Sequence, residues 1–334
     1  MHFTMLMVNK IKNKGKRVID MQKTAGSNLS SASRGTRLRK RFASWQLYVM
    51  VIPALLYILL FHYKPMYGII IAFKDFSMRR GILGSEWVGM ANFTRLFSSY
   101  WFPVIIKNTL TLSLLSLVVG FPMPIILALM LNEVNSGRFR KTFQTVSYAP
   151  HFISTVVMCG MLVIFTNPTH GIFNILLNKL GFESINFLGI AADFKWVYVL
   201  SGVWQEVGWG SIIYFAALSS LDKSLLEAAD IDGANRLQKI WYINLPVLVP
   251  TIMVLLILNF GSLLSVGYEK VYLLQNDTNL SASEVISTYV YKVGLQQADF
   301  SFSAATDVFN SVVNTCILLL ANGMSKWLTK TSLF

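Results

Sequence analysis

Long uncharged stretches divide this chain into six segments, each close to the length of a membrane-spanning helix. A bilayer core about 30 Å thick needs about 20 apolar residues of helix at 1.5 Å per residue. Aromatic residues flank most of the segments, as expected for rings at headgroup depth. We therefore expect an all-α integral membrane protein with six transmembrane helices, over residues 45–63, 108–131, 148–165, 196–221, 247–268 and 308–325.

The composition agrees with a membrane protein. Of the 334 residues, 54% are hydrophobic and 13% are charged, whereas a soluble domain has about 25% charged residues. Too few polar side chains remain to cover a soluble core. Cys159 and Cys316 both lie in apolar runs, so we expect buried thiols, with no disulfide framework and no metal site.

The net charge of +13 is explained by topology. Lys and Arg gather in cytoplasmic connections of membrane proteins. Of the 29 Lys and Arg, 19 lie in residues 10–41, in the second-to-third and fourth-to-fifth connections and at the C-terminus. This distribution predicts that both termini are cytoplasmic, and the charge requires no nucleic-acid partner.

Two domains follow from this pattern. Residues 1–43 hold 11 Lys and Arg and a Gly/Ser stretch, which predicts a basic, largely disordered cytoplasmic arm attracted to anionic lipids. Residues 44–330 form the membrane domain. No secretory signal precedes it, because residues 1–8 are too short for an apolar signal core, and Met21 is an alternative start to Met1.

The connection between the fourth and fifth segments has the most specific pattern. Ser224 followed by Glu227 predicts a capping box that starts a short helix, and Gly233 predicts its end at positive φ. A second helical run over residues 236–243 leads to Pro246, which we expect to start the fifth segment. Residues 224–246 thus predict a helix–glycine–helix elbow on the cytoplasmic face.

The spacing within this elbow matches a known signature. Glu227-Ala228-Ala229, Gly233 and Ile243-x-Leu245-Pro246 follow the EAA-x3-G-x9-I-x-L-P pattern without departure. The chain resembles the permease subunits of type I ATP-binding-cassette importers, whose coupling helix docks into an ATPase subunit. The resemblance implies the type I permease fold and an ATPase-coupling role for these eight residues: Glu227, Ala228, Ala229, Asp230, Gly233, Ile243, Leu245 and Pro246.

Further segments narrow the resemblance to permeases for complex oligosaccharides of the alginate, aldouronate and rhamnogalacturonan kind. They are residues 63–68, 144–154, 204–214, 232–234, 288–291 and 294–295. The family then implies a subunit that passes an oligosaccharide from an extracytoplasmic binding lipoprotein into the cytoplasm, in a bacterial inner membrane. It implies as partners a second EAA-bearing permease and two ATPase subunits that use ATP and Mg.

The chain lacks a catalytic or nucleotide-binding signature of its own. It has no G-x-x-x-x-G-K-[ST] phosphate loop and no clustered carboxylates with histidine, so we expect no bound cofactor and no enzymatic activity. Two alternatives stay open. A secondary transporter would normally need ionisable residues in several segments, and a membrane glycan or lipid transferase would need a catalytic constellation. Neighbouring genes for a second EAA-bearing permease and a sugar-binding protein would favour the importer, and the absence of both would favour these alternatives.

Candidate residues for a sugar pathway lie in the last three segments. Sugars need hydrogen-bonding groups and flat apolar faces, and Glu206 is an ionisable residue within an apolar segment, where charge is costly. Packing between helices explains such residues equally well. The candidates are Trp204, Glu206, Trp209, Tyr214, Asn259, Asn310 and Asn314.

Overall fold

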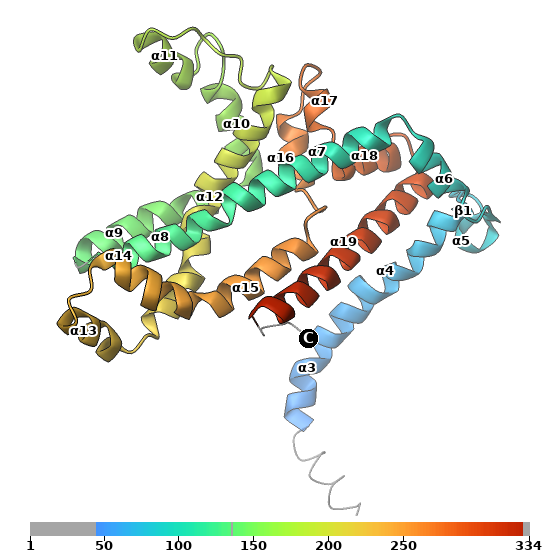
Figure 1. Ribbon diagram of the computed structural model, residues 1–334. Coiled ribbons are helices and arrows are strands. Elements are labelled where there is room, and N and C mark those ends of the chain that lie inside the picture. Colours follow the sequence, from blue (N-terminus) through green and yellow to red (C-terminus); the bar gives the residue numbers. More distant parts are fainter. Residues whose placement is uncertain (1–44, 135, 330–334) are drawn as a thin grey trace, which may run out of the picture. The chain divides into compact units, whose positions relative to one another are not determined.

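The computed structural model describes residues 45–134 and 136–329 (Figure 1). The predicted basic arm, residues 1–43, lies outside the described residues. The chain divides into two units, one ending at Tyr67 and one beginning at Gly68. The described residues of both units are mostly helical, which confirms the predicted helical class.

The described part of the first unit is one helical run. Its elements are α3 (Trp45–Ile58), η1 (Leu59–Tyr63) and α4 (Lys64–Met66). The segment η2 (Tyr67–Phe73) then continues into the second unit, so the run covers the first predicted segment and extends beyond it.

The second unit contains the remaining helices and one small hairpin, in which β1 (Lys74–Asp75) pairs antiparallel with β2 (Glu86–Trp87). The helices before the elbow are α5 (Gly81–Gly84), α6 (Ala91–Ser98), α7 (Trp101–Leu115), η3 (Ser116–Gly120), α8 (Pro122–Asn132), α9 (Gly137–Tyr148), η4 (Ala149–Phe152), α10 (Thr155–Phe165), α11 (Ile172–Lys179) and α12 (Ala191–Ser219). Those from the elbow onward are α13 (Lys223–Ile231), α14 (Arg236–Lys239), η5 (Ile240–Asn244), α15 (Leu245–Gly261), α16 (Tyr268–Leu274), α17 (Leu280–Ser283), α18 (Ile286–Tyr291), η6 (Lys292–Gln296) and α19 (Phe300–Thr329).

Four helical stretches of the described residues are long and apolar enough to cross a membrane: Tyr48–Phe73, Trp101–Asn132, Arg236–Gly261 and Phe300–Lys326. A bent pair, Gly137–Phe152 and Thr155–Phe165, makes a fifth if it is one crossing. The predicted fourth segment forms α12, a continuous helix of 29 residues. It is long enough to cross a bilayer, but Gln205, Glu206 and its glycines dilute its apolar character.

Two predicted segments differ in course from the helices observed, and the second and sixth helices begin earlier than predicted, at Trp101 and Phe300. Residues 148–165 do not form one straight helix, because η4 intervenes and α10 begins only after Ser154, whose hydroxyl accepts from Val157 N. The chain bends by 97° there. The fifth helix runs earlier than predicted, from Arg236 to Gly261, and residues 262–267 leave it as an irregular turn before α16.

Proline explains three π-helical turns. The π segments η1, η3 and η5 each directly precede a turn with proline in its first positions, namely Pro65, Pro122 and Pro246. Proline has no N–H and its ring collides with the carbonyl four residues earlier. A π turn inserts an extra residue into the hydrogen-bond ladder at that point. The helical stretch Arg236–Gly261 therefore continues through Pro246. The prediction that Pro246 starts the fifth helix is correct for the α-helical part α15, which has Pro246 in its first turn, but not for the whole stretch.

The core of the second unit forms where α12 packs along α8 and α15 packs along α19. Helix α12 also packs closely against α9. Gly208 on α12 permits this contact, because a Cβ at that position would lie 2.0 Å from the carbonyl oxygen of Ser147 on α9. A separate apolar cluster includes Phe194 and Met158, which link α12 to α10. These contacts hold in place the helices that line the cavity described below.

Candidate functional site

The elbow begins with a capped helix. Asp222 is the N-cap of α13, and its carboxylate accepts a hydrogen bond from Ser224 N at 3.0 Å. This hydrogen bond lowers the pKa of the Asp222 carboxyl from its usual value. The predicted capping box of Ser224 and Glu227 is therefore wrong, because a carboxylate two residues earlier takes the capping position.

The turn of the elbow requires a glycine. Gly233 has φ +76°, in the left-handed region that side chains disfavour. Two backbone hydrogen bonds close the end of α13: Gly233 N donates to Asp230 O at 3.1 Å, and Ala234 N donates to Ala229 O at 2.9 Å. The helix thus ends as predicted from Gly233, in the manner of a Schellman motif.

The second limb starts at once, with a capping box that the sequence analysis missed. Asn235 caps α14, accepting from Gln238 N at 2.9 Å, while the Gln238 side chain accepts from Asn235 N at 2.7 Å. An ion pair between Lys239 and Asp230 joins the two limbs. The elbow is therefore a bent unit with a defined angle rather than a loose loop.

The elbow presents an unusual surface. Glu227 and Ala228 are exposed, and Ala229 is half-buried. Large apolar side chains are also exposed on both limbs, including Ile231 at 87% and Tyr242 at 78%. Exposed apolar groups around small residues are typical of a protein–protein contact.

The base of the elbow is anchored in the fold. Ile243, Leu245 and Pro246 lie where η5 passes into α15. Between them, Asn244 is fully buried and its amide donates to Glu133 Oε1 at 3.5 Å. Figure 1 shows α13 and α14 at one end of the second unit, with β1, α5 and α6 at another end.

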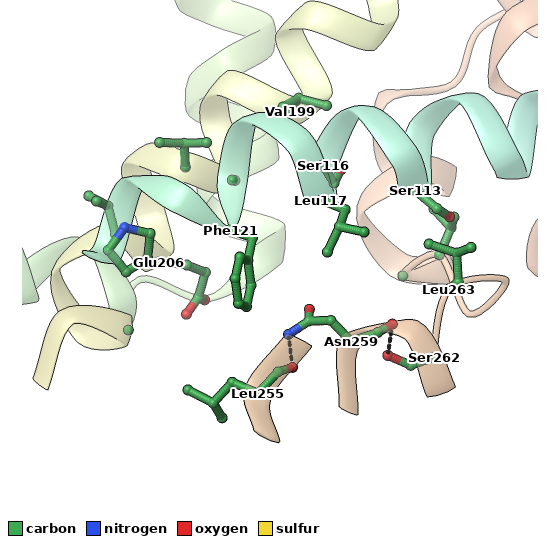
Figure 2. A pocket seen from close by; sticks show the side chains of 18 of the residues that line it. Ser113, Ser116, Leu117, Phe121, Val199, Glu206, Leu255, Asn259, Ser262 and Leu263 are labelled. Atoms are coloured by element: carbon green, nitrogen blue, oxygen red, sulfur yellow. Dashed lines mark hydrogen bonds between the residues drawn. The ribbon is translucent and has the colours of Figure 1, made fainter. Parts of the chain in front are cut away.

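A cavity of about 590 Å³ lies between helices of the second unit. Its walls come from α7, η3, α8, α12, α15, the turn at residues 262–267 and α16. In Figure 2, Phe121 and Glu206 point toward the segment that carries Asn259, on α15, and Ser262, directly after it. The lining is mixed, with both apolar walls and hydrogen-bonding groups.

Glu206 lines this cavity and has a partner outside it. Glu206 Oε2 lies 3.0 Å from His151 Nδ1. The His151 ring in turn stacks on Trp209, with centroids 4.4 Å apart and planes 4° from parallel. Next to Glu206, the Gln205 amide donates to Ile153 O at 2.9 Å. These contacts hold α12 against the bend before α10.

Lys270 is the second charged residue of the cavity lining, beside Glu206, and it was not among the predicted pathway residues. Its ammonium donates to Tyr198 O at 2.7 Å and lies 4.6 Å from the centre of the Tyr198 ring. Burial lowers the pKa of Lys270 to about 8, so the group is mostly charged at neutral pH. The sequence feature that could have identified Lys270 is its position directly after the predicted fifth segment.

The other predicted pathway residues divide into two groups. Tyr214 and Asn259 line the cavity together with Glu206. Trp204, Trp209, Asn310 and Asn314 do not. Asn314 is buried and holds the turn after α15, accepting from Leu264 N at 2.9 Å and donating to Ser265 Oγ at 3.1 Å. Asn310 Oδ1 is buried without a hydrogen-bond partner among the described residues.

A buried ionic network ties α17, α18 and η6 to α7. Glu284 is 3% exposed and forms an ion pair with Lys292 at 2.5 Å. Glu284 Oε1 also accepts from Thr288 Oγ1 at 2.9 Å, and the Asn108 amide donates to Glu284 O at 2.9 Å. Glu284 was not among the candidate residues named from the sequence.

Comparisons with known proteins agree with this architecture. A family described as binding-protein-dependent transport system inner membrane component matches residues 120–330. The polygalacturonan/rhamnogalacturonan transport system permease protein YteP of Bacillus subtilis (strain 168) is 46% identical over 280 residues, covering 84% of this chain and 87% of that protein. Protein LplB of the same strain is 42% identical over 288 residues, covering 86% and 91%.

Two solved structures are similar in fold and in sequence. One is a bacterial ABC transporter involved in the import of the acidic polysaccharide alginate, with a TM-score of 0.81 and 45% identity, covering 88% of this chain and 99% of that chain. The other is a bacterial alginate ABC transporter in complex with an alginate pentasaccharide-bound periplasmic protein. Its TM-score is 0.82 and its identity 44%, with the same coverage of both chains.

Proposed function

Because the chain belongs to the family of binding-protein-dependent transport system inner membrane components, we infer that it is the permease subunit of an ATP-driven importer of oligosaccharides. Relatives over 84% and 88% of the chain are a polygalacturonan/rhamnogalacturonan permease and an alginate transporter. The observation that carries the inference is the EAA-type signature folded as an exposed helix–glycine–helix elbow. The chain is a transport component and not itself an ATPase.

We propose six crossings with both termini in the cytoplasm. The four apolar stretches, the bent pair of α9 to α10, and α12 together make six. With 29 residues, α12 is about 43 Å long and exceeds the bilayer core of about 30 Å. Its polar positions are tolerated if they face other helices or a water-filled cavity. The Lys and Arg bias supports the orientation.

The elbow is proposed to dock on an ATPase subunit that binds ATP and Mg. Glu227, Ala228, Ala229, Asp230 and Gly233 form the exposed bend. The small side chains of Ala228 and Ala229 allow close approach of another chain, and the exposed apolar residues around them supply contact area. Ile243, Leu245 and Pro246 then join the bend to α15.

The cavity is proposed to be part of the sugar pathway. Glu206, Tyr214 and Asn259 line it and offer hydrogen-bonding groups and an aromatic ring. We propose that a second EAA-bearing permease completes the pathway, and that an extracytoplasmic binding lipoprotein delivers the sugar. Residues 44–330 would then form one permease domain in the bacterial inner membrane, working by alternating access.

Reconstitution tests the proposal. The chain is assembled with its cognate second permease, ATPase and binding protein in proteoliposomes, and uptake of labelled oligosaccharide is measured. Uptake should require ATP and the binding protein and should persist when ion gradients are collapsed. Uptake that follows an ion gradient without ATP would instead support a secondary transporter, and conversion of the sugar without transport would support a transferase.

A further inference from the structure

Lys270 is a half-buried cation that forms no ion pair with any of the described residues. In residues 45–134 and 136–329, ion pairs join Arg80 to Asp75, Arg95 to Asp299, His151 to Glu206, Lys239 to Asp230 and Lys292 to Glu284, and none includes Lys270. A partly buried ammonium without a carboxylate is costly unless something compensates it.

The contrast with Glu206 sharpens this observation. Both groups line the same cavity, but Glu206 is already hydrogen bonded to His151, which does not line it. The two opposite charges of the cavity are therefore not paired with each other. The Glu206 carboxylate contacts His151, whereas the Lys270 ammonium contacts a carbonyl oxygen and a tyrosine ring. The Glu206 charge acts on this ammonium electrostatically but forms no ion-pair contact with it.

The surroundings of Lys270 leave room for a ligand. An ammonium has three N–H donors, and one of them is used by Tyr198 O at 2.7 Å. Gly202 and Gly267 line the cavity beside Lys270, and a Cβ on Gly202 would lie 3.1 Å from Nζ. A side chain is thus missing next to the ammonium at Gly202. Polar groups of Asn259 and Ser262 line the same space.

We propose that Lys270 binds a carboxylate of the oligosaccharide as it passes through the cavity, and so selects acidic, uronate-bearing saccharides over neutral ones. This inference rests on the proposed function and assigns a specificity-determining residue to it. A charge-assisted N–H···O bond to a carboxylate supplies the missing counter-ion. Neutral sugars make the same hydroxyl contacts but leave the ammonium unpaired.

The test compares an acid with its ester on the whole complex. Oligogalacturonate and its methyl ester have the same ring and length but differ in charge. Binding of each to the complete transporter in nanodiscs, without the binding protein, is measured by saturation-transfer NMR at millimolar concentrations. The wild type should bind the acid more tightly than the ester. Lys270→Gln should weaken acid binding about ten- to hundred-fold and leave the ester within two-fold.

Two variants separate recognition from structure. Lys270→Arg keeps the positive charge and should keep the preference for the acid. Lys195→Gln removes an ammonium from α12 outside the cavity lining and should change neither ligand. A purely structural role of Lys270, linking α16 to Tyr198, predicts instead that Lys270→Gln lowers binding of acid and ester equally, or lowers only the thermal stability of the complex.

The remaining outcomes separate failure of this inference from failure of the importer function. If the wild type shows no preference for the acid, or Lys270→Gln retains it, the inference is overturned while the importer function stands. The inference is also overturned if the reconstituted wild type takes up sugar but shows no saturable binding of acid in nanodiscs. If the wild type takes up no oligosaccharide with ATP and binding protein, the proposed function itself fails.

Discussion

The glycine at the bend of the elbow permits a sharp test of coupling. Gly233 has φ +76°, and a Cβ built there meets no atom within 4 Å. A substitution therefore strains the backbone without colliding with a neighbour. The left-handed conformation costs about 1–2 kcal/mol for a residue with a side chain, and a β-branched residue is disfavoured further. Gly233→Val should therefore raise the free energy of the intact bend by at least this amount.

The backbone strain at residue 233 acts on a helix of low intrinsic stability, α13. The nine-residue helix α13 is too short to be stable alone, and two backbone hydrogen bonds close its end. A strain of about 1–2 kcal/mol changes the ratio of intact to unwound bend by a factor of about 5–30. We expect substrate-stimulated ATP hydrolysis and uptake in proteoliposomes to fall by about that factor or more, while the subunits still co-purify.

Two control variants separate the effect of the left-handed backbone conformation at residue 233 from other effects of a substitution. Gly233→Asn should stay within about two-fold of the wild type, because asparagine tolerates positive φ. Gly181→Val imposes similar strain at φ +87°, also in open space, but outside the elbow, and should leave coupling unchanged. Normal uptake by Gly233→Val, or equal loss in Gly233→Val and Gly233→Asn, would refute the reasoning that the left-handed bend transmits force.

Two further substitutions test the packing that supports the site. Gly208→Ala places a Cβ 2.0 Å from the Ser147 carbonyl oxygen, so the purified complex should lose about 1–3 kcal/mol and melt at lower temperature; Gly160→Ala, with open space, should melt like the wild type. Lys292→Met leaves Glu284 buried without its ion pair, which costs about 3–5 kcal/mol, and adding Glu284→Gln should restore much of the melting temperature. An unchanged melting temperature for Gly208→Ala or for Lys292→Met would contradict the packing described.

The fold could be predicted in outline from the alternation of apolar and polar stretches. The helical class, the positions of the long helices and the bend at Gly233 follow from local rules. The breaks do not. The turn between α9 and α10 depends on how α12 packs against residues 147–153, where Gly208 meets the Ser147 carbonyl. Periodicity along one segment carries no information about such contacts.

Local capping shows why element ends are hard to predict even with clear motifs. Ser224 and Glu227 fit a capping box, yet Asp222 captures Ser224 N. Both Ser224 and Asp222 are good N-caps by residue type, so a two-residue shift costs little and tertiary context decides. At Asn235 and Gln238 the same motif does form, at the start of the helical run predicted from residue 236.

The site divides in the same way. The elbow is contiguous in sequence, so a spacing signature found it. The cavity is assembled from helices far apart in the chain, so composition could identify Glu206 as costly but could not place Lys270 in the same lining. Conversely, Asn314 fits a pathway residue by type, but its amide is used to hold the turn at residues 264–265.

The connection between elbow and cavity suggests how force would travel. The helical stretch Arg236–Gly261 begins in the second limb of the elbow and carries Asn259 in the cavity wall. On the other side, α12 carries Glu206 and ends at Ser219, three residues before Asp222, the N-cap of the first limb. Both walls therefore continue into the bend, and helices transmit axial displacement over their length. A displaced elbow should thus move opposite walls of the cavity together.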